Sequence, residues 1–141
     1  GLFFLDRTAL QMLHISQTSE LRVLAARSTR PCQCPLAPCK GWSSMSEDRW
    51  PENQMKRVAT LRDPDLTEPT FEEWHPKGTR YDDPAAPVAL AYFPYNRCDV
   101  WQCLSCLQTV LRYTEFGGYY VDHRVRLLDA DLIVDAPAPA P

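Results

Sequence analysis

Two cysteines, Cys103 and Cys106, form the one arrangement in this chain whose spacing is typical of known chemistry. Thiolates bind zinc and carry out thiol–disulfide exchange, and both uses employ pairs of cysteines separated by two residues. The pair lies within residues 98–126, which also contain the Gly117-Gly118 pair between two apolar runs. We therefore expect this stretch to hold the functional site and the remaining elements to position it.

The segment after the cysteines is predicted to be a β-hairpin. Apolar and polar side chains alternate along residues 119–127, as they do in a half-buried strand. Residues 107–114 are rich in β-branched and aromatic side chains, and the glycine pair supplies a turn between the two segments. The alternative is a helix over 100–113 with Asp99 as its N-cap, because apolar residues there also share one helical face.

In the hairpin interpretation, Cys103 and Cys106 lie in a tight turn that leads into the hairpin. This arrangement resembles one half of a zinc ribbon or zinc knuckle, over about residues 103–126. The resemblance implies a structural zinc ion bound by four ligands, with zinc as the cofactor. It also implies a positive φ directly after the second cysteine, where the family usually has glycine and this chain has Leu107.

The remaining zinc ligands must come from elsewhere in the sequence. Cys98 and Asp129 are the nearest candidates, although Cys98 reaches the site only if residues 99–102 are not extended. The spacing of Cys32, Cys34 and Cys39 in a proline-rich loop is not typical of zinc sites, but this loop could fold over and supply ligands.

In the helical alternative, the two thiols lie one turn apart near a helix N-terminus, where the dipole favours the thiolate. That arrangement resembles thioredoxin-like proteins and implies a thiol–disulfide redox protein that uses Cys103 and Cys106. Two features depart from that family. Trp101 is not adjacent to Cys103, and no proline is placed to flank the thiols in cis.

Composition and charge narrow the function classes. The 141 residues are 45% hydrophobic and 23% charged, which is typical of one globular domain. The net charge is −3, and no apolar run is long enough to span a membrane. We therefore expect another protein as the partner, a basic one, and neither nucleic acid nor a membrane. We place the chain in the cytoplasm, where paired cysteines indicate metal or redox chemistry rather than disulfides.

A change of composition near residues 40–46 divides the chain, since basic residues prevail before it and acidic and aromatic residues after it. We predict an appendage at 1–44 with a helix over 6–28 and a Pro-Cys loop, a single α+β domain at 45–135, and a disordered Ala-Pro tail at 136–141. The domain is predicted to be a small antiparallel sheet with a central hairpin, built from 88–93, 107–114, 119–127 and 131–134, with a short helix over 52–62.

No common catalytic or nucleotide-binding motif occurs, so we expect no catalytic residues. The chain is predicted to be a small acidic interaction protein, by analogy with bacterial adaptor or immunity-type proteins. A homodimer is the alternative to a different protein partner. Aromatic and arginine side chains are favoured at protein interfaces, and the candidate binding residues are Tyr120, Arg124, Arg126 and Trp74.

Overall fold

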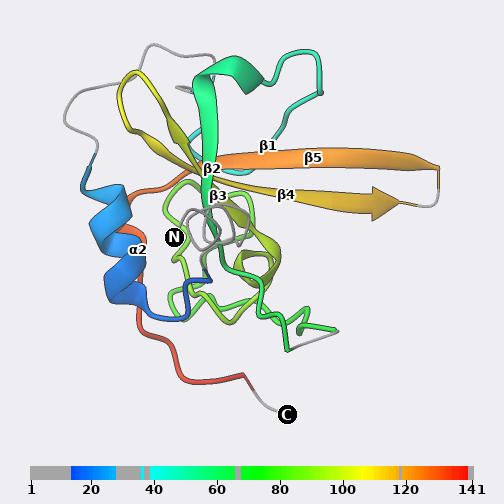
Figure 1. The fold of residues 1–141 in the computed structure, drawn as a ribbon. Helices are drawn as coiled ribbons and strands as arrows, with labels where there is room; N and C mark the ends of the chain where they lie inside the picture. Colours follow the sequence, from blue (N-terminus) through cyan, green and yellow to red (C-terminus); the bar gives the residue numbers. More distant parts are fainter. Residues whose placement is uncertain (1–13, 28–35, 37–38, 66–67, 118, 140–141) are drawn as a thin grey trace.

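The described part of the chain forms a five-stranded antiparallel sheet with one α-helix near its N-terminal end, consistent with the predicted small α+β class (Figure 1). The computed structural model describes residues 14–27, 36, 39–65, 68–117 and 119–139. The strand order is β1-β5-β4-β3-β2. The elements are α2 (Thr18–Ala25), β1 (Ser43–Ser44), β2 (Met55–Thr60), β3 (Asp99–Cys103), β4 (Thr109–Gly117), β5 (Tyr120–Leu127) and the 3-10 helices η1 (Glu52–Gln54), η2 (Tyr95–Arg97) and η3 (Ala130–Leu132).

Strands β4 and β5 form the predicted hairpin, and the helical alternative for 100–113 is wrong. Their pairing runs from Val110 opposite Leu127 to Gly117 opposite Tyr120, which leaves two residues between the paired segments. Strand β3 lies against the other edge of β4. Cys103 is therefore the last residue of β3, and Cys106 lies in the connection to β4 rather than in a helix.

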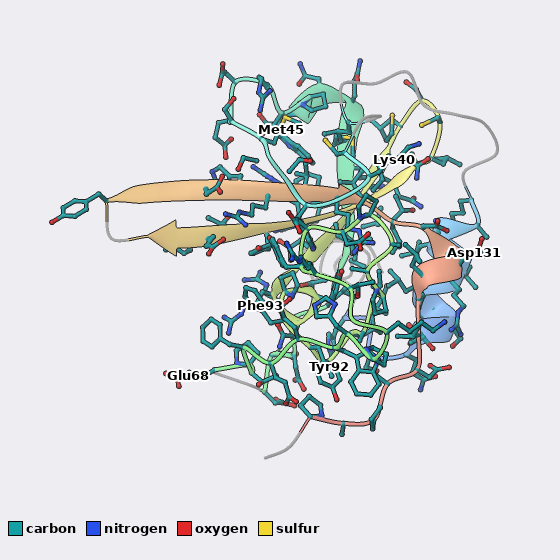
Figure 2. All side chains as sticks on the ribbon, turned by 180° about the vertical axis from the view of Figure 1, so that it is seen from behind. Lys40, Met45, Glu68, Tyr92, Phe93 and Asp131 are labelled. Carbon is teal, nitrogen blue, oxygen red and sulfur yellow. The ribbon has the colours of Figure 1, made fainter. Side chains whose placement is uncertain are left out.

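The outer part of this hairpin, residues 115–117 of β4 with 120–122 of β5, projects from the body as a two-stranded ribbon (Figures 1 and 2). Strand β3 pairs with β4 only as far as Arg112, and β1 pairs with β5 only at 124 and 125. Within the described residues the ribbon strands pair only with each other. Figure 2 shows the ribbon pointing away from the side of the body that carries Asp131.

Successive residues of a strand point to opposite sides of a sheet. Buried side chains pack on both faces of this sheet and form two cores. Figure 2 shows Met45 on one side of the sheet, with Tyr92 and Phe93 on the other. The main core consists of Ile15, Leu21, Leu24, Trp42, Ala59, Leu61, Val88, Tyr95, Cys98, Val100, Leu111, Tyr113, Leu128 and Ile133. The second core consists of Leu36, Cys39, Met45, Trp50, Met55, Cys103, Cys106, Val110 and Val125.

Helix α2 packs into the main core and does not belong to an appendage. Leu21 and Leu24 are buried there, in the same cluster as residues of β3 and β4. The Leu24 carbonyl oxygen also accepts hydrogen bonds from Gln102 Nε2 at 3.2 Å and the Thr109 hydroxyl at 3.1 Å. The described part of 1–44 therefore packs against the sheet, with α2 in the main core and Leu36 and Cys39 in the second core. The first part of the predicted helix, 6–13, lies outside the described residues.

The predicted helix over 52–62 is instead η1 followed by β2. A β-bulge between Arg57 and Ala59 shifts the register of β2 on β3. Because a bulge adds one residue, Met55 packs in the second core and Ala59 in the main core, on opposite faces. The four-residue spacing of these apolar side chains therefore imitates a helical period.

The predicted strands at 88–93 and 131–134 contribute no ladder to the sheet. They touch through a single bridge between Val88 and Ile133. The other residues of the two segments lie in turns, in irregular backbone and in η3. Val88, Ala89 and Tyr92 are nevertheless buried, so the apolar run reflects burial without strand pairing.

The C-terminal segment 136–139 has no regular secondary structure, and residues 140–141 lie outside the described part. The Tyr92 hydroxyl donates to the Pro137 carbonyl oxygen, which attaches this part of the Ala-Pro segment to the body. In the described part of the chain, no helix is both long and apolar enough to cross a membrane.

Candidate functional site

Residues 103–108, the cysteine turn, connect β3 to β4 and contain both cysteines of the pair. The Leu107 N–H donates to the Cys103 carbonyl oxygen at 2.8 Å, and the Cys103 N–H donates to the Gln108 carbonyl oxygen at 3.0 Å. Leu107 has a φ of 63°, which lies in the left-handed region and is the only positive φ of a non-glycine residue in the described chain. The backbone thus adopts the conformation that the zinc-knuckle resemblance implies, with leucine in place of glycine.

Both thiols of the cysteine turn are buried, with Cys103 1% and Cys106 6% exposed. The Gln108 N–H is directed at Cys106 Sγ at 3.4 Å. Apolar side chains of the second core, including Leu36 and Met55, surround the pair and limit access of solvent.

The other two predicted ligands are placed elsewhere. Cys98 is fully buried in the main core, and its thiol donates to the Pro94 carbonyl oxygen at 3.2 Å. Because β3 is extended between Cys98 and Cys103, their Cα atoms are roughly 16 Å apart at about 3.3 Å per residue. Burial raises the pKa of the Cys98 thiol well above its usual value, which disfavours the thiolate that a metal would need.

Asp129 is exposed and caps η3, where its carboxylate accepts the Asp131 N–H at 2.9 Å. The structure therefore does not assemble Cys103, Cys106, Cys98 and Asp129 into one site. More generally, no group of three or more His, Cys, Asp or Glu side chains within the described ranges is arranged to hold a metal ion.

Cys39 is a further candidate metal ligand, although its spacing from the other cysteines in the sequence is not typical of a zinc site. It is buried in the second core together with the cysteine turn, and its carbonyl oxygen accepts the Leu127 N–H at 2.8 Å. Burial raises the pKa of the Cys39 thiol, and a hydrogen bond with Ser43 partly opposes this effect. The described part of the Pro-Cys loop therefore covers the same core, while Cys32 and Cys34 lie outside the described residues. The apolar Leu36 between prolines was the sequence signal for this packing.

Arg126, a predicted surface binding residue, is buried and structural. It is 1% exposed, and its guanidinium donates to the Tyr95 hydroxyl and to the carbonyl oxygens of Pro84 and Ala86, the last two at 3.1 and 2.8 Å. These acceptors compensate the guanidinium for the loss of water. Prediction of Arg126 as a binding residue is therefore wrong, since no part of it is available to a partner.

The other predicted binding residues differ in availability. Arg124 is partly exposed but donates to the Asp122 carboxylate at 2.8 Å and to the Tyr81 hydroxyl at 3.1 Å. The hydrogen bond from Arg124 lowers the pKa of Asp122. Trp74 is half-buried against the ring of Tyr92. The Tyr120 side chain lies outside the described part of the structure.

The ribbon tip carries large apolar side chains that the alternating pattern had suggested would face a core. Phe116 is 78% exposed, Val121 is 55% exposed and Tyr119 is fully exposed. Phe116 and Val121 are directly opposite each other across the two strands, so their side chains share one face. Together with Tyr119 at the turn they form an apolar patch at the far end of the ribbon, here called the ribbon tip.

Comparison of the chain with protein-family models, curated proteins and solved structures finds no match. The cysteine turn and the ribbon tip are then the two features from which a function can be inferred. Their exposure separates their roles, because buried thiols suit stabilisation whereas an exposed apolar tip suits binding.

Proposed function

We propose that this protein is a non-enzymatic interaction module that contacts another protein through its ribbon tip. The observation that carries the proposal is the exposure of Phe116, Tyr119 and Val121 at the end of a projecting ribbon. Aromatic side chains supply much of the binding energy of protein interfaces when a partner buries them. Large apolar side chains grouped in this way in water are otherwise unfavourable, which supports a binding role.

Charge favours a basic rim on the partner's pocket. The chain has a net charge of −3, and Glu115 lies opposite Asp122 directly behind the tip, where these two carboxylates share the single guanidinium of Arg124. Basic side chains around an apolar pocket would attract this end of the molecule and speed association. A second copy of the chain would bring like charges together, so a different protein is the favoured partner.

Photo-crosslinking tests this proposal. A photoreactive amino acid at 119 is expected to form an adduct with one defined protein in cells, whereas the same group at the exposed position 80 is not. The partner identified by mass spectrometry is then purified and titrated against the chain. We expect Phe116→Ser with Val121→Ser to weaken binding at least about 10-fold.

The matched control is Val23→Ser, which removes an exposed apolar side chain from α2. It should leave the affinity unchanged. Equal weakening by the control, or no adduct at 119, would contradict the proposal. An adduct between two copies of the chain would indicate that the ribbon tip forms a homodimer rather than binding a different, basic protein.

We also propose that the cysteine turn is one half of a structural zinc site. Cys103 and Cys106 would supply two of the four ligands of a tetrahedral ion. The left-handed Leu107 and the Gln108 N–H on Cys106 Sγ support this role. Since Cys98 lies at the other end of β3, the remaining thiols in the sequence are Cys39 and the two cysteines before it. Bound zinc would neutralise the thiolates and stabilise the second core.

Metal analysis of the purified protein and of single Cys→Ser variants tests the zinc site. We expect about one zinc per chain, lost in Cys103→Ser and in Cys106→Ser. Cys98→Ser is the control, because serine can still donate to the Pro94 carbonyl oxygen, and it should keep its zinc. Variants at 32, 34 and 39 identify the remaining ligands.

A protein that binds no zinc, or a Cys98 variant that loses it equally, would contradict the site. A metal-free protein with a reactive thiolate at Cys103 or Cys106 near neutral pH would support the redox alternative instead.

A further inference from the structure

A groove of about 810 Å³ lies where β4 continues past the first residue of β3, at the base of the ribbon. Its walls come from β2, β3, β4, residues 62–64, Pro69 and residues 96–97, with His14. The volume is within the range of small-molecule sites. The groove is separate from the cysteine turn, which lies at the opposite end of β3.

The groove is basic although the chain as a whole is acidic. Its charged lining consists of Arg57, Arg62, Arg97 and Arg112, with Asp63, Asp99 and His14. Arg57 and Arg62 each approach the single Asp99 carboxylate at 3.5 Å, and both side chains are about half exposed. Arg112 forms an ion pair with Glu47, with 3.0 Å between Arg112 Nη2 and Glu47 Oε1, and Glu47 is not part of the lining. One carboxylate shared by two guanidinium groups leaves positive charge facing the groove.

Three buried N–H donors of the groove lining have no hydrogen-bond acceptor among the described residues. They are Trp101 Nε1, Arg97 Nε and Arg112 Nε. A buried donor without an acceptor is unfavourable by about 1–3 kcal/mol, so most such groups in proteins have a partner. Two buried oxygen atoms of the same lining, Asn96 Oδ1 and Asp99 Oδ1, also have no hydrogen-bond partner among the described residues. The groove wall therefore holds several polar groups that the described chain leaves unpaired.

Aromatic rings line the groove beside these donors. Trp101, Tyr113 and Phe116 are part of its wall. The Arg112 guanidinium lies 4.4 Å from the centre of the Trp50 ring and 5.8 Å from that of Trp101, so this arginine is already held against aromatic faces. A flat ligand body could stack on such rings while its anionic group reaches the arginines.

We infer that this groove binds a small organic anion, a carboxylate or phosphate group attached to an aromatic body. The anionic group would lie beside the half-exposed guanidinium groups of Arg57 and Arg62, whose charge the single Asp99 carboxylate only partly neutralises. The aromatic body would contact Trp101 and Phe116. This activity goes beyond protein binding at the ribbon tip and does not require zinc.

Nuclear magnetic resonance of the Trp101 indole N–H, assigned from its absence in Trp101→Phe, tests the inference. The intact chain is titrated separately with phenyl phosphate, benzoate and inorganic phosphate. We expect a saturable shift of this signal with an aromatic anion, with a Kd of about 1 mM or lower. Whether phenyl phosphate or benzoate binds more tightly identifies the anionic group as phosphate or carboxylate.

The variant Arg57→Gln with Arg62→Gln should weaken binding at least about 10-fold. The control, Arg27→Gln with Arg80→Gln, makes the same charge change at exposed sites outside the groove and should weaken it less than about 2-fold. Unchanged signals from the main core in each spectrum establish that the variants fold.

Absence of a saturable shift up to about 20 mM of every probe would overturn the inference. So would equal weakening by the two double variants, which would show a general effect of charge. Equal affinity for inorganic and phenyl phosphate would overturn the assignment of the aromatic body. Phe116 belongs to both the tip and the groove wall, but Val121 is not part of the groove lining. Because partner affinity reports on the tip and the Trp101 signal with the arginine pair reports on the groove, failure of one proposal is distinguishable from failure of the other.

Discussion

The Leu107 N–H closes the cysteine turn by donating to the Cys103 carbonyl oxygen at 2.8 Å, while Leu107 itself is held at a φ of 63°. A left-handed conformation is unfavourable for a leucine by about 1–2 kcal/mol compared with a right-handed one. The side chain is 42% exposed and therefore gains little from burial. Hydrogen bonds of the turn and burial of its two cysteines must outweigh this strain.

Leu107→Gly is expected to raise the free energy of unfolding by about 0.5–1 kcal/mol. Glycine removes the strain, and its greater freedom in the unfolded chain offsets part of that gain. Leu107→Val should lower the free energy of unfolding by about 1 kcal/mol or more, because β-branched residues tolerate this conformation poorly. Urea denaturation measures both. A glycine variant less stable than the parent would show that Leu107 packing matters more than backbone strain.

Arg126→Met should lower the free energy of unfolding by about 3 kcal/mol or more. The change leaves the buried carbonyl oxygen of Ala86 and the carbonyl oxygen of Pro84 without their donor, and it removes the partner of the Tyr95 hydroxyl. The matched control is Arg124→Met, on the same face of β5 but partly exposed. This variant should lower the free energy of unfolding by about 1 kcal/mol or less relative to the parent. Similar losses in the two variants would refute a structural role specific to Arg126.

Leu24→Ala should destabilise the whole domain by about 2–4 kcal/mol, because Leu24 is buried in the main core. Its neighbour Val23 is 62% exposed, so Val23→Ala should change stability by less than about 0.5 kcal/mol. Thermal unfolding, followed by circular dichroism, compares the two. If α2 belonged to an independent appendage, both substitutions would leave the main transition unchanged.

Alkaline pH should destabilise the protein through Tyr95. Burial raises the pKa of its hydroxyl to about 12, from an ordinary value of 10.0. Since the folded pKa is the higher one, this stabilisation is fully present below about pH 10 and is lost between about pH 10 and 12. Denaturation series across this range, with tyrosinate absorbance as a second probe, should show a smaller pH dependence in Tyr95→Phe. An unchanged dependence in that variant would assign the effect to other groups.

The hairpin could be predicted because local features agree there: alternation along 119–127 requires a neighbouring strand, and Gly117-Gly118 supplies the turn. Other elements depended on tertiary packing that local patterns do not encode. The bulge in β2 placed Met55 and Ala59 on opposite faces and produced a spacing typical of a helix. Proline-flanked Val88 is buried like a strand residue but makes only a single bridge.

The candidate site was predictable only in part for the same physical reason. The spacing of Cys103 and Cys106 identified the cysteine turn, but the partner of a thiol depends on which distant segment covers it. Arg126 appeared to belong to a surface stripe because charged residues alternate along β5. Its burial depends on acceptors from residues 84–86 and Tyr95, which are far away in the sequence.

Strand β4 begins at the cysteine turn and ends at the ribbon tip, nine residues that extend over about 30 Å. The orientation of the tip is therefore fixed by how firmly the first residues of this strand are anchored. An anchored tip is pre-organised, so a partner binding there loses less conformational entropy than with a freely swinging hairpin. If zinc anchors the cysteine turn, removing it with a chelator would weaken recognition at the tip without altering any residue that the partner contacts.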